Sequence, residues 1–165
     1  MSSDFFDSIM EDLYGLYSIK PPTEISTSVY FTLKSGLQIA FEMSDHPQGL
    51  LLATELGPLT RTASRTLWIQ EALRWNGATE GIGQIGLNKS QDRLVCFHLF
   101  SLVFLTAQHI YEIVPKFEER ALVWKNAVES GYPPTLPGST QIQGEEFNPF
   151  RAGSAAGRFV GTLRP

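Results

Sequence analysis

Two short segments with alternating apolar residues, at positions 29–33 and 37–43, limit most strongly what this chain can fold into. A period of two is typical of a half-buried strand. Only three residues connect the segments, and the last is Gly36, which can adopt the positive φ that a three-residue hairpin loop favours. The pairs implied by this loop are Leu33 with Leu37, Phe31 with Ile39, and Val29 with Phe41. Because all six side chains then share one face, loop length and register agree and predict an antiparallel hairpin.

Periodicity divides the rest of residues 1–130 into further elements. We expect a first helix from Asp4, which caps it, to about Ile19, and a third strand of an antiparallel meander at 50–56. A second helix, capped by Ser64, is expected at 65–76, followed by strands at 82–88 and 93–100. A long helix at 102–128 completes the order. Pro115 lies inside the last pattern and removes a backbone hydrogen bond, so a kink or a break is expected near Val114. The predicted class is α+β, in the order α-β-β-β-α-β-β-α, with helices packed on an antiparallel sheet.

Composition limits the classes of function. The chain has 165 residues, of which 42% are hydrophobic and 18% charged, which fits one domain with a good core. Its formal charge of -4 and the lack of a basic run argue against nucleic acid or an anionic membrane surface as the main partner. The most apolar segment, around 97–105, is too short to span a bilayer, so no membrane insertion is expected. The first residues carry Asp4 and Asp7 instead of a basic and then apolar run, so we expect no signal peptide. A single cysteine, Cys96, cannot form an internal disulfide and fits a reducing cytosol.

The last part of the chain, residues 131–165, differs from what precedes it. It is rich in Gly, Pro, Ser, Thr and Gln and shows neither the helical nor the strand period. Its large apolar residues are Phe147, Phe150 and Phe159. We therefore expect an α+β domain at 1–130 followed by a flexible tail, with docking of the phenylalanines on the domain or a partner as the alternative.

The predicted helix at 65–76 has more apolar surface than a single sheet requires. Only Gln70, Glu71 and Arg74 make its polar face, whereas about 100° of apolar arc is enough to cover a sheet. The excess includes two tryptophans. Burial against a second copy, in a two-fold dimer, is one interpretation, and burial of both tryptophans in the core of a single chain is the other.

A glycine-rich run at 81–86 matches the G-x-G-x-x-G pattern of dinucleotide-binding turns. In those turns the glycines follow a strand and open a helix, whose N-terminus holds the pyrophosphate. Here they are expected to follow a helix and open a strand. The nucleotide interpretation is therefore rejected, and the glycines are expected to allow close packing where the strand begins.

Histidine and cysteine give no firm catalytic or metal site. His46, His98 and His109 are expected in a loop, a strand and a helix, without the paired spacing of a zinc site. Cys96 and His98 would point to the same side of one strand, but an activated thiolate needs an electropositive, partly exposed setting. The neighbours of Cys96 are apolar, so an inert buried thiol is the favoured interpretation. No catalytic residue, cofactor or metal is predicted.

Two runs within these elements resemble the class I, CesT-type secretion chaperones of bacterial type III systems. They are residues 67–76, Leu-Trp-Ile-Gln-Glu-Ala-Leu-Arg-Trp-Asn, and residues 83–88, Gly-Gln-Ile-Gly-Leu-Asn. In that family a helix ending in Asn leads to a glycine-rich strand entry that ends in Asp, where this chain has Asn88. Element order, size and acidity match as well, over about residues 4–130.

The resemblance implies a cytoplasmic bacterial homodimer without enzymatic activity or cofactor. Such a protein binds the N-terminal region of secreted effectors, keeps it non-globular for export and docks on the secretion ATPase. By this analogy the dimer contact is expected at Trp68, Ile69, Ala72 and Trp75. Effector binding is expected at exposed apolar positions of the first helix and hairpin, namely Phe5, Leu13, Tyr17, Tyr30 and Leu33, and beside them on the hairpin side formed by Tyr30, Thr32, Gln38, Ala40 and Glu42.

Two other functions remain open from the sequence. One is a cytoplasmic regulator or scaffold with the same architecture, which would differ from a chaperone only in its partner. The other is a small enzyme or ligand-binding domain that uses a pocket behind Cys96 and His98.

Overall fold

The computed structural model describes residues 2–22, 27–45, 48–59, 65–78, 81–88 and 90–136. These form three helices and a five-stranded sheet. The elements are α1 (Ser2–Leu16), β1 (Ser28–Thr32), β2 (Gln38–Asp45), β3 (Gln48–Pro58), α2 (Arg65–Ala78), β4 (Gln84–Asn88), β5 (Arg93–Phe100) and α3 (Ala107–Ser130). The α+β class and the order of elements are those that the sequence predicts.

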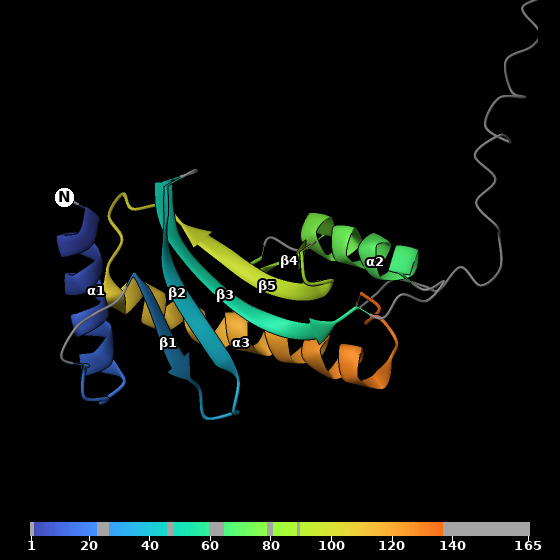
Figure 1. Cartoon of the computed structure of the whole chain (residues 1–165), viewed down its shortest axis with the longest axis horizontal. Coiled ribbons are helices and arrows are strands. Elements are labelled where there is room, and N and C mark those ends of the chain that lie inside the picture. The colour runs from blue at the N-terminus through green and yellow to red at the C-terminus, as the bar shows by residue number, and fades with distance from the viewer. Residues whose placement is uncertain are drawn as a thin grey trace, which may run out of the picture.

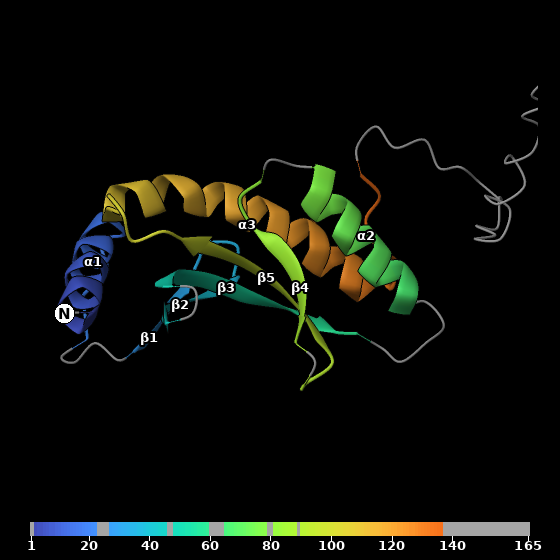
Figure 2. The ribbon, with the colours of Figure 1, turned by 90° about the horizontal axis from the view of Figure 1, so that it is seen from above.

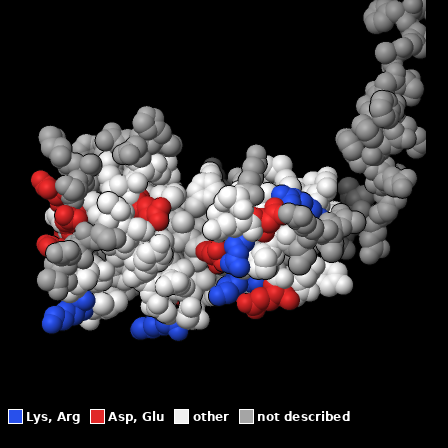
Figure 3. All heavy atoms as spheres, in the orientation of Figure 1, with Lys and Arg blue, Asp and Glu red and all other residues white. Residues whose placement is uncertain are grey.

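The strands are antiparallel in the order β1-β2-β3-β5-β4, so β1 and β4 form the two edges. All three helices lie on one side of the sheet (Figures 1 and 2). Helix α3 runs along that side, with α1 near its beginning and α2 near its end. Among the described residues, no helix covers the opposite face. On this uncovered face, acidic and basic side chains are scattered among uncharged ones (Figure 3).

The hairpin of β1 and β2 has the predicted register. Phe31 pairs with Ile39 and Val29 with Phe41. Leu33 N–H donates to the Leu37 carbonyl at 2.9 Å, and Gly36 N–H donates to the Leu33 carbonyl at 2.9 Å. Gly36 has φ +82°, the left-handed conformation that the three-residue loop requires. The register places the large apolar side chains of both strands on the helix side, where they are buried.

Helix α3 supplies the largest part of the core opposite the sheet. Its buried residues recur at helical spacing, and Ile110, Phe117 and Trp124 are completely inaccessible to solvent. Thr106 caps the helix by accepting a hydrogen bond from His109 N–H at 3.2 Å, and Gly131 ends it with φ +83°. The predicted start at residue 102 is therefore wrong, because 101–106 form a loop that leads to this cap.

Of the two outcomes expected at Pro115, a kink or a break, the break is wrong, because α3 continues through the proline. Pro115 faces solvent, whereas Val114 and Phe117 on the two sides of it are buried in the same core. Packing before and after the proline thus outweighs one lost backbone bond. Figure 2 shows α3 as a single bowed helix.

Smaller differences occur at element ends. Helix α1 begins at Ser2, so Asp4 lies in its first turn and is not the cap. Strand β3 extends past Gly57 to Pro58 through an irregularity between Glu55 and Gly57. The proposed cap Ser64 lies outside the described residues. Within the described ranges, no helix is long and apolar enough to cross a membrane.

Residues 131–136, the first of the predicted tail, lie against the domain. Tyr132 N–H donates to the Ala127 carbonyl at 3.2 Å, and the indole N–H of Trp75 donates to the Pro134 carbonyl at 3.1 Å. Leu136 is half-buried against the core. The rest of the predicted tail, with its three phenylalanines, lies outside the described residues.

A pair of glycine substitutions tests the hairpin loop. Gly36→Ala should lower the unfolding free energy by about 1–2 kcal/mol, because a Cβ is disfavoured in the left-handed region. Its Cβ would meet no atom within 4 Å, so only backbone strain is measured. Gly77→Ala, on α2 and equally open, is the control and should be neutral or stabilise by up to about 1 kcal/mol. Equal effects of the two substitutions in urea unfolding would contradict the loop assignment.

Candidate functional site

The two tryptophans of α2 are buried within this chain. Trp68 and Trp75 are 3% and 9% exposed, and their rings lie 6.1 and 5.9 Å from that of Trp124. The inference that they need a second copy for burial is therefore wrong, because α3 covers them. Ala72 is buried too, and only Ile69 of the four predicted dimer residues is exposed, at 38%. The dimer itself stays a prediction.

The exposed apolar residues of α2 are Leu67, Ile69 and Leu73, of which Leu73 is 66% exposed. They lie on the side of the helix that does not face Trp124. Of the four residues predicted for the dimer contact, only Ile69 is among them. The sequence does not show which side of this helix is covered, because nearly its whole circumference is apolar.

Of the residues predicted to bind an effector, two are not available on the surface. Leu13 and Leu33 are buried, because α1 packs on the hairpin and Tyr14 stacks on Phe31 with ring centroids 4.8 Å apart. Phe5 and Tyr17 are half-buried, and Tyr30 is 59% exposed. The helical pattern identified an apolar stripe but not which part of it the hairpin covers.

Tyr17 instead belongs to a groove of about 350 Å³ between the end of α1, the turn end of β1 and the middle of α3. The lining is mostly apolar, and several of its residues are partly exposed. It consists of Leu16, Tyr17, Ile19, Phe31, Thr32, Leu33, Lys34, Tyr111, Val114, Pro115 and Glu118. We call this hollow the apolar groove.

The centre of the apolar groove is an aromatic cluster. The Tyr17 ring lies 5.5 Å from that of Phe31 and 5.0 Å from that of Tyr111. Burial, and after it the nearby Tyr111 and Glu118, raise the pKa of Tyr17 to about 12. The phenol is therefore neutral near pH 7, and charge is confined to the rim, at Lys34 and Glu118. Ser35 Oγ donates to a Glu118 carboxylate oxygen and ties the hairpin turn to α3.

Pro115 also leaves one backbone carbonyl beside the apolar groove without its helical hydrogen bond. It has no N–H, so the carbonyl of Tyr111, four residues earlier, loses its helical donor. Both residues line the groove. Sequence reasoning missed Tyr111 and Pro115 as site residues, although a proline inside an amphipathic helix is a signal for such a place.

The apolar groove lies beside the β1 edge of the sheet. Leu33 and Leu37 form a hydrogen-bonded pair, and in an antiparallel ladder such pairs alternate with pairs that exchange no hydrogen bonds. The backbone N–H and C=O groups of Thr32 and Tyr30 therefore point away from β2. No further strand pairs with β1 in the described part of the chain. The groove lining includes Phe31, Thr32 and Leu33, which lie at the turn end of the β1–β2 hairpin. The open edge and the apolar groove therefore adjoin each other.

On the other side of the same edge is a shallow polar hollow of about 660 Å³ on the uncovered face. Tyr30, Gln38, Ala40 and Glu42, four of the five residues predicted on this hairpin side, line it together with Ala53, Glu55, Asn88, Gln91 and Val95. The β1 edge is thus flanked by an apolar hollow on the helix side and a polar one on the open side. This arrangement suits an extended chain whose side chains alternate between the two faces.

Comparison with known proteins gives similarity at the level of structure only. No protein-family model and no curated protein sequence matches the chain. Its structure is similar to the HopA1-SchA chaperone-effector complex, with a TM-score of 0.63 and 15% identity over 77% of this chain and 98% of that one. It has the class I secretion-chaperone fold.

Two further solved structures share this fold. One is the heterodimeric ExoU-SpcU complex from the type III secretion system of Pseudomonas aeruginosa, with a TM-score of 0.57 and 11% identity over 71% of this chain and 95% of that one. The other is the ExsC-ExsE complex, with a TM-score of 0.54 and 10% identity over 73% of this chain and 91% of that one. The predicted resemblance is thereby confirmed for the fold.

Within this fold, Cys96 and His98 do not form a reactive pair. Cys96 is fully buried, and burial raises the pKa of its thiol to about 12, the opposite of what a nucleophile needs. His98 Nδ1 accepts a hydrogen bond from Gly83 N–H at 3.4 Å. His46 lies outside the described residues, and no group of three His, Cys, Asp or Glu among those described could hold a metal ion.

The run at 81–86 opens β4 and not a helix, as predicted from the sequence. Gly83 has φ +90°, and a Cβ there would lie 3.0 Å from Cys96 Sγ. Close packing at the start of the strand thus explains this glycine.

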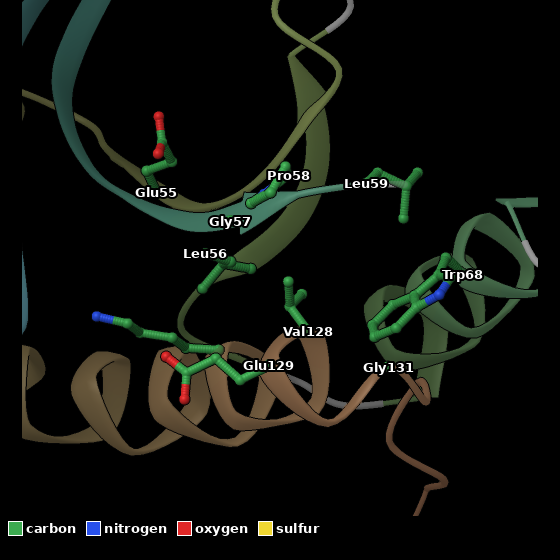
Figure 4. Close-up of a pocket in the computed structure, with 10 residues that line it drawn as sticks. Glu55, Leu56, Gly57, Pro58, Leu59, Trp68, Val128, Glu129 and Gly131 are labelled. Carbon is green, nitrogen blue, oxygen red and sulfur yellow. The ribbon is translucent and has the colours of Figure 1, made fainter. Parts of the chain in front are cut away.

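A second apolar hollow, of about 460 Å³, lies between the end of β3, Trp68 of α2 and the end of α3. Figure 4 shows Leu56, Val128 and Trp68 around it, with Glu129 on α3 and Glu55 on β3. Strand β3 pairs with β2 only over residues 48–53, so its last residues beside this hollow pair with β5 alone and leave a short open edge, whereas β1 is open along its whole length on the side away from β2 in the described part of the chain. The apolar groove beside β1 is therefore the better candidate for holding an extended chain.

Acidification should destabilise the protein through His98. Burial, and then His109, lower its folded-state pKa below the ordinary value of 6.5, so the unfolded chain binds the proton more tightly. This contribution to stability is complete above pH 6.5 and is lost as the pH falls through the folded-state pKa. The urea midpoint should therefore fall between about pH 7.5 and about pH 5.5, and by less in His98→Gln.

His109→Gln is the matched control for this measurement. It removes the repulsion between the two imidazoles, together with the ring contact of His109 with Phe100, and keeps the Gly83 hydrogen bond, so its effect on the pH dependence should be smaller. An identical pH dependence in His98→Gln and the parent would show that His98 does not titrate between the two states.

Proposed function

We propose that this protein is a type III secretion chaperone that holds the N-terminal segment of a secreted effector, extended and non-globular, along the β1 edge. The observation that carries the proposal is the adjacency of an open strand edge and an apolar groove. Support comes from the fold, which is shared with a structure described as a chaperone-effector complex.

The binding mode follows from the geometry of the edge. The bound segment adds a strand beside β1 and exchanges hydrogen bonds with the outward backbone groups of Tyr30 and Thr32. Its side chains then alternate, with those on one face about 6.7 Å apart. One set enters the apolar groove and the other lies over Tyr30 and the polar hollow. A chain held in this way cannot fold around its own apolar residues, which keeps it fit for export.

Charge assists this encounter without deciding it. The net charge of -4 favours approach of basic segments and disfavours self-association. At the groove itself Lys34 and Glu118 provide one charge of each sign. The proposed selectivity is therefore mainly for apolar side chains at every second position.

The remaining parts of the proposal concern assembly and delivery. We propose a cytoplasmic protein without catalytic activity that forms a homodimer and delivers its cargo to the secretion ATPase. For the homodimer, the exposed Ile69 and Leu73 of α2 are the supporting observation, because apolar side chains four residues apart share one side of the helix and suit a two-fold contact.

Substitutions at the β1 edge test the binding mode. Tyr30→Pro removes an N–H that points away from β2, so the hairpin ladder is kept while strand addition is blocked. Tyr30→Thr keeps the N–H and is the control. In the tagged protein purified from its native cell, the proline variant should recover at least about tenfold less bound partner, equivalent to about 1.4 kcal/mol. Mass spectrometry and limited proteolysis should identify the partner as a protease-sensitive N-terminal segment.

A groove variant completes this test. Ile19→Glu places a carboxylate at an exposed lining position and should weaken binding to a similar degree, because burying a charge is costly. Val103→Glu adds the same charge at an exposed apolar position outside the groove lining and outside α2, and should not weaken it. Undiminished binding in both Tyr30→Pro and Ile19→Glu, or a folded globular partner, would overturn the chaperone proposal and favour a regulator of the same fold.

The dimer proposal is tested separately on α2. Leu73→Glu should convert the dimer to monomer in light scattering, because Leu73 is 66% exposed in a single chain and its replacement leaves the core intact. Val103→Glu adds the same charge at an apolar position outside α2 that is 70% exposed, and should leave the dimer unchanged. An unaltered mass for Leu73→Glu would place the interface elsewhere.

A further inference from the structure

The second edge of the sheet differs from the first in one specific contact. The side chain of Asn76, in the last turns of α2, makes two hydrogen bonds to the backbone of Ile85 in β4. Asn76 Nδ2–H donates to the Ile85 carbonyl at 2.9 Å, and Ile85 N–H donates to Asn76 Oδ1 at 2.9 Å. One primary amide thus makes the pair of bonds that a residue of a neighbouring antiparallel strand would make.

These bonds lie on the outer side of β4. Strand β4 pairs only with β5 among the described strands, and backbone groups alternate in direction along it. Since the N–H and the C=O of Ile85 are both bound to Asn76, they point away from β5. Asn76 therefore occupies the place where an added strand would pair with β4.

The position of Asn76 is held by its neighbours. The Arg120 guanidinium, on α3, donates to the carbonyl of Trp75 at 3.0 Å and to that of Ile82 at 3.5 Å. It also lies 5.6 Å from the Trp75 ring centroid. One cation thereby ties the end of α2 to the segment that enters β4. The amide of Asn76 is fixed against the strand edge by structure on both sides of it.

We propose that Asn76 is a built-in edge block: it stands in for a sixth strand at β4, and so confines partner strands to the β1 edge. The proposal rests on strand addition as the mode of binding. An open edge is a template for any chain that can extend, including a second copy of the same protein. With one edge occupied by an amide and the other flanked by the apolar groove, an added strand has a single place to bind.

The alternative is that Asn76 serves only to stabilise the junction of α2 and β4. In that case its removal would lower stability without changing which edge accepts a strand. A stability measurement cannot separate the two interpretations. The test must report directly on the location of an added strand.

Asn76→Ala is the primary variant, and Asn76→Asp is the second. The carboxylate of Asn76→Asp can still accept from Ile85 N–H but cannot donate to the Ile85 carbonyl, so it retains part of the contact if the alanine variant fails to fold. The amide of Ile85 should exchange with deuterium at least about tenfold faster in Asn76→Ala, because its hydrogen-bond acceptor is gone. Ile39, on the inner strand β2, is the internal control.

The decisive probe is a synthetic octapeptide of alternating valine and threonine with an N-terminal spin label. In the full-length parent protein, the amide signals of Tyr30 and Thr32 should broaden and that of Leu87 should not. In Asn76→Ala, and more weakly in Asn76→Asp, Leu87 should broaden as well. Broadening of Leu87 in the parent, or its absence in both folded variants, would overturn the edge block.

Failure of the proposed function gives a different result. If Leu87 broadens only in the Asn76 variants while Tyr30 and Thr32 never broaden, the edge block stands and strand addition at β1 is wrong. If Tyr30 and Thr32 broaden equally in all proteins and Leu87 in none, the β1 mode stands and Asn76 has only a structural role.

Discussion

The packing of α3 against the sheet and against both other helices is the interaction on which this structure depends. Near the beginning of α3, Val114 borders the apolar groove and Ile110 is buried below α1. Near its end, Trp124 is enclosed between the tryptophans of α2. The Trp124 indole N–H has no hydrogen-bond partner among the described residues, which costs about 1–3 kcal/mol. Burial of the ring offsets that cost, because a Trp contributes 150–250 Å² of apolar area at about 25 cal/mol per Å².

How much of the fold could be predicted depends on whether the deciding contacts are local. The hairpin register was predictable because three loop residues, a glycine and a period of two specify it within fifteen positions. The burial of Trp68 and Trp75 was not, because the residue that covers them, Trp124, is far along the chain. Leu13 and Leu33 were misplaced for the same reason: a stripe of apolar residues shows that something covers a helix or strand, but not which residues remain uncovered.

The site was harder to predict than the fold because it exists only where three elements meet. Tyr17, Thr32 and Pro115 come from α1, β1 and α3, and no spacing in the sequence relates them. The open edge likewise depends on strand order. In the sheet, β5 lies between β3 and β4, so β4 forms an edge. The periodicity of the sequence does not reveal this order of strands. Tyr17 and Tyr30, two of the predicted effector contacts, line the apolar groove and the polar hollow, and their role in binding stays a prediction.

The two edges also explain how a chain with an open strand can remain free of self-pairing. Strand β1 has five residues, and Lys34 follows closely after it, so its edge is short and bounded by charge, both of which disfavour sheet-to-sheet contact. Strand β4 has five residues as well, and Lys89 follows it directly in the sequence, so length and charge protect the two edges to a similar degree. The amide of Asn76 adds a pair of hydrogen bonds to this protection at β4. An edge that must accept a partner can be protected only by length and charge, whereas an edge that must not accept one can be closed by hydrogen bonds.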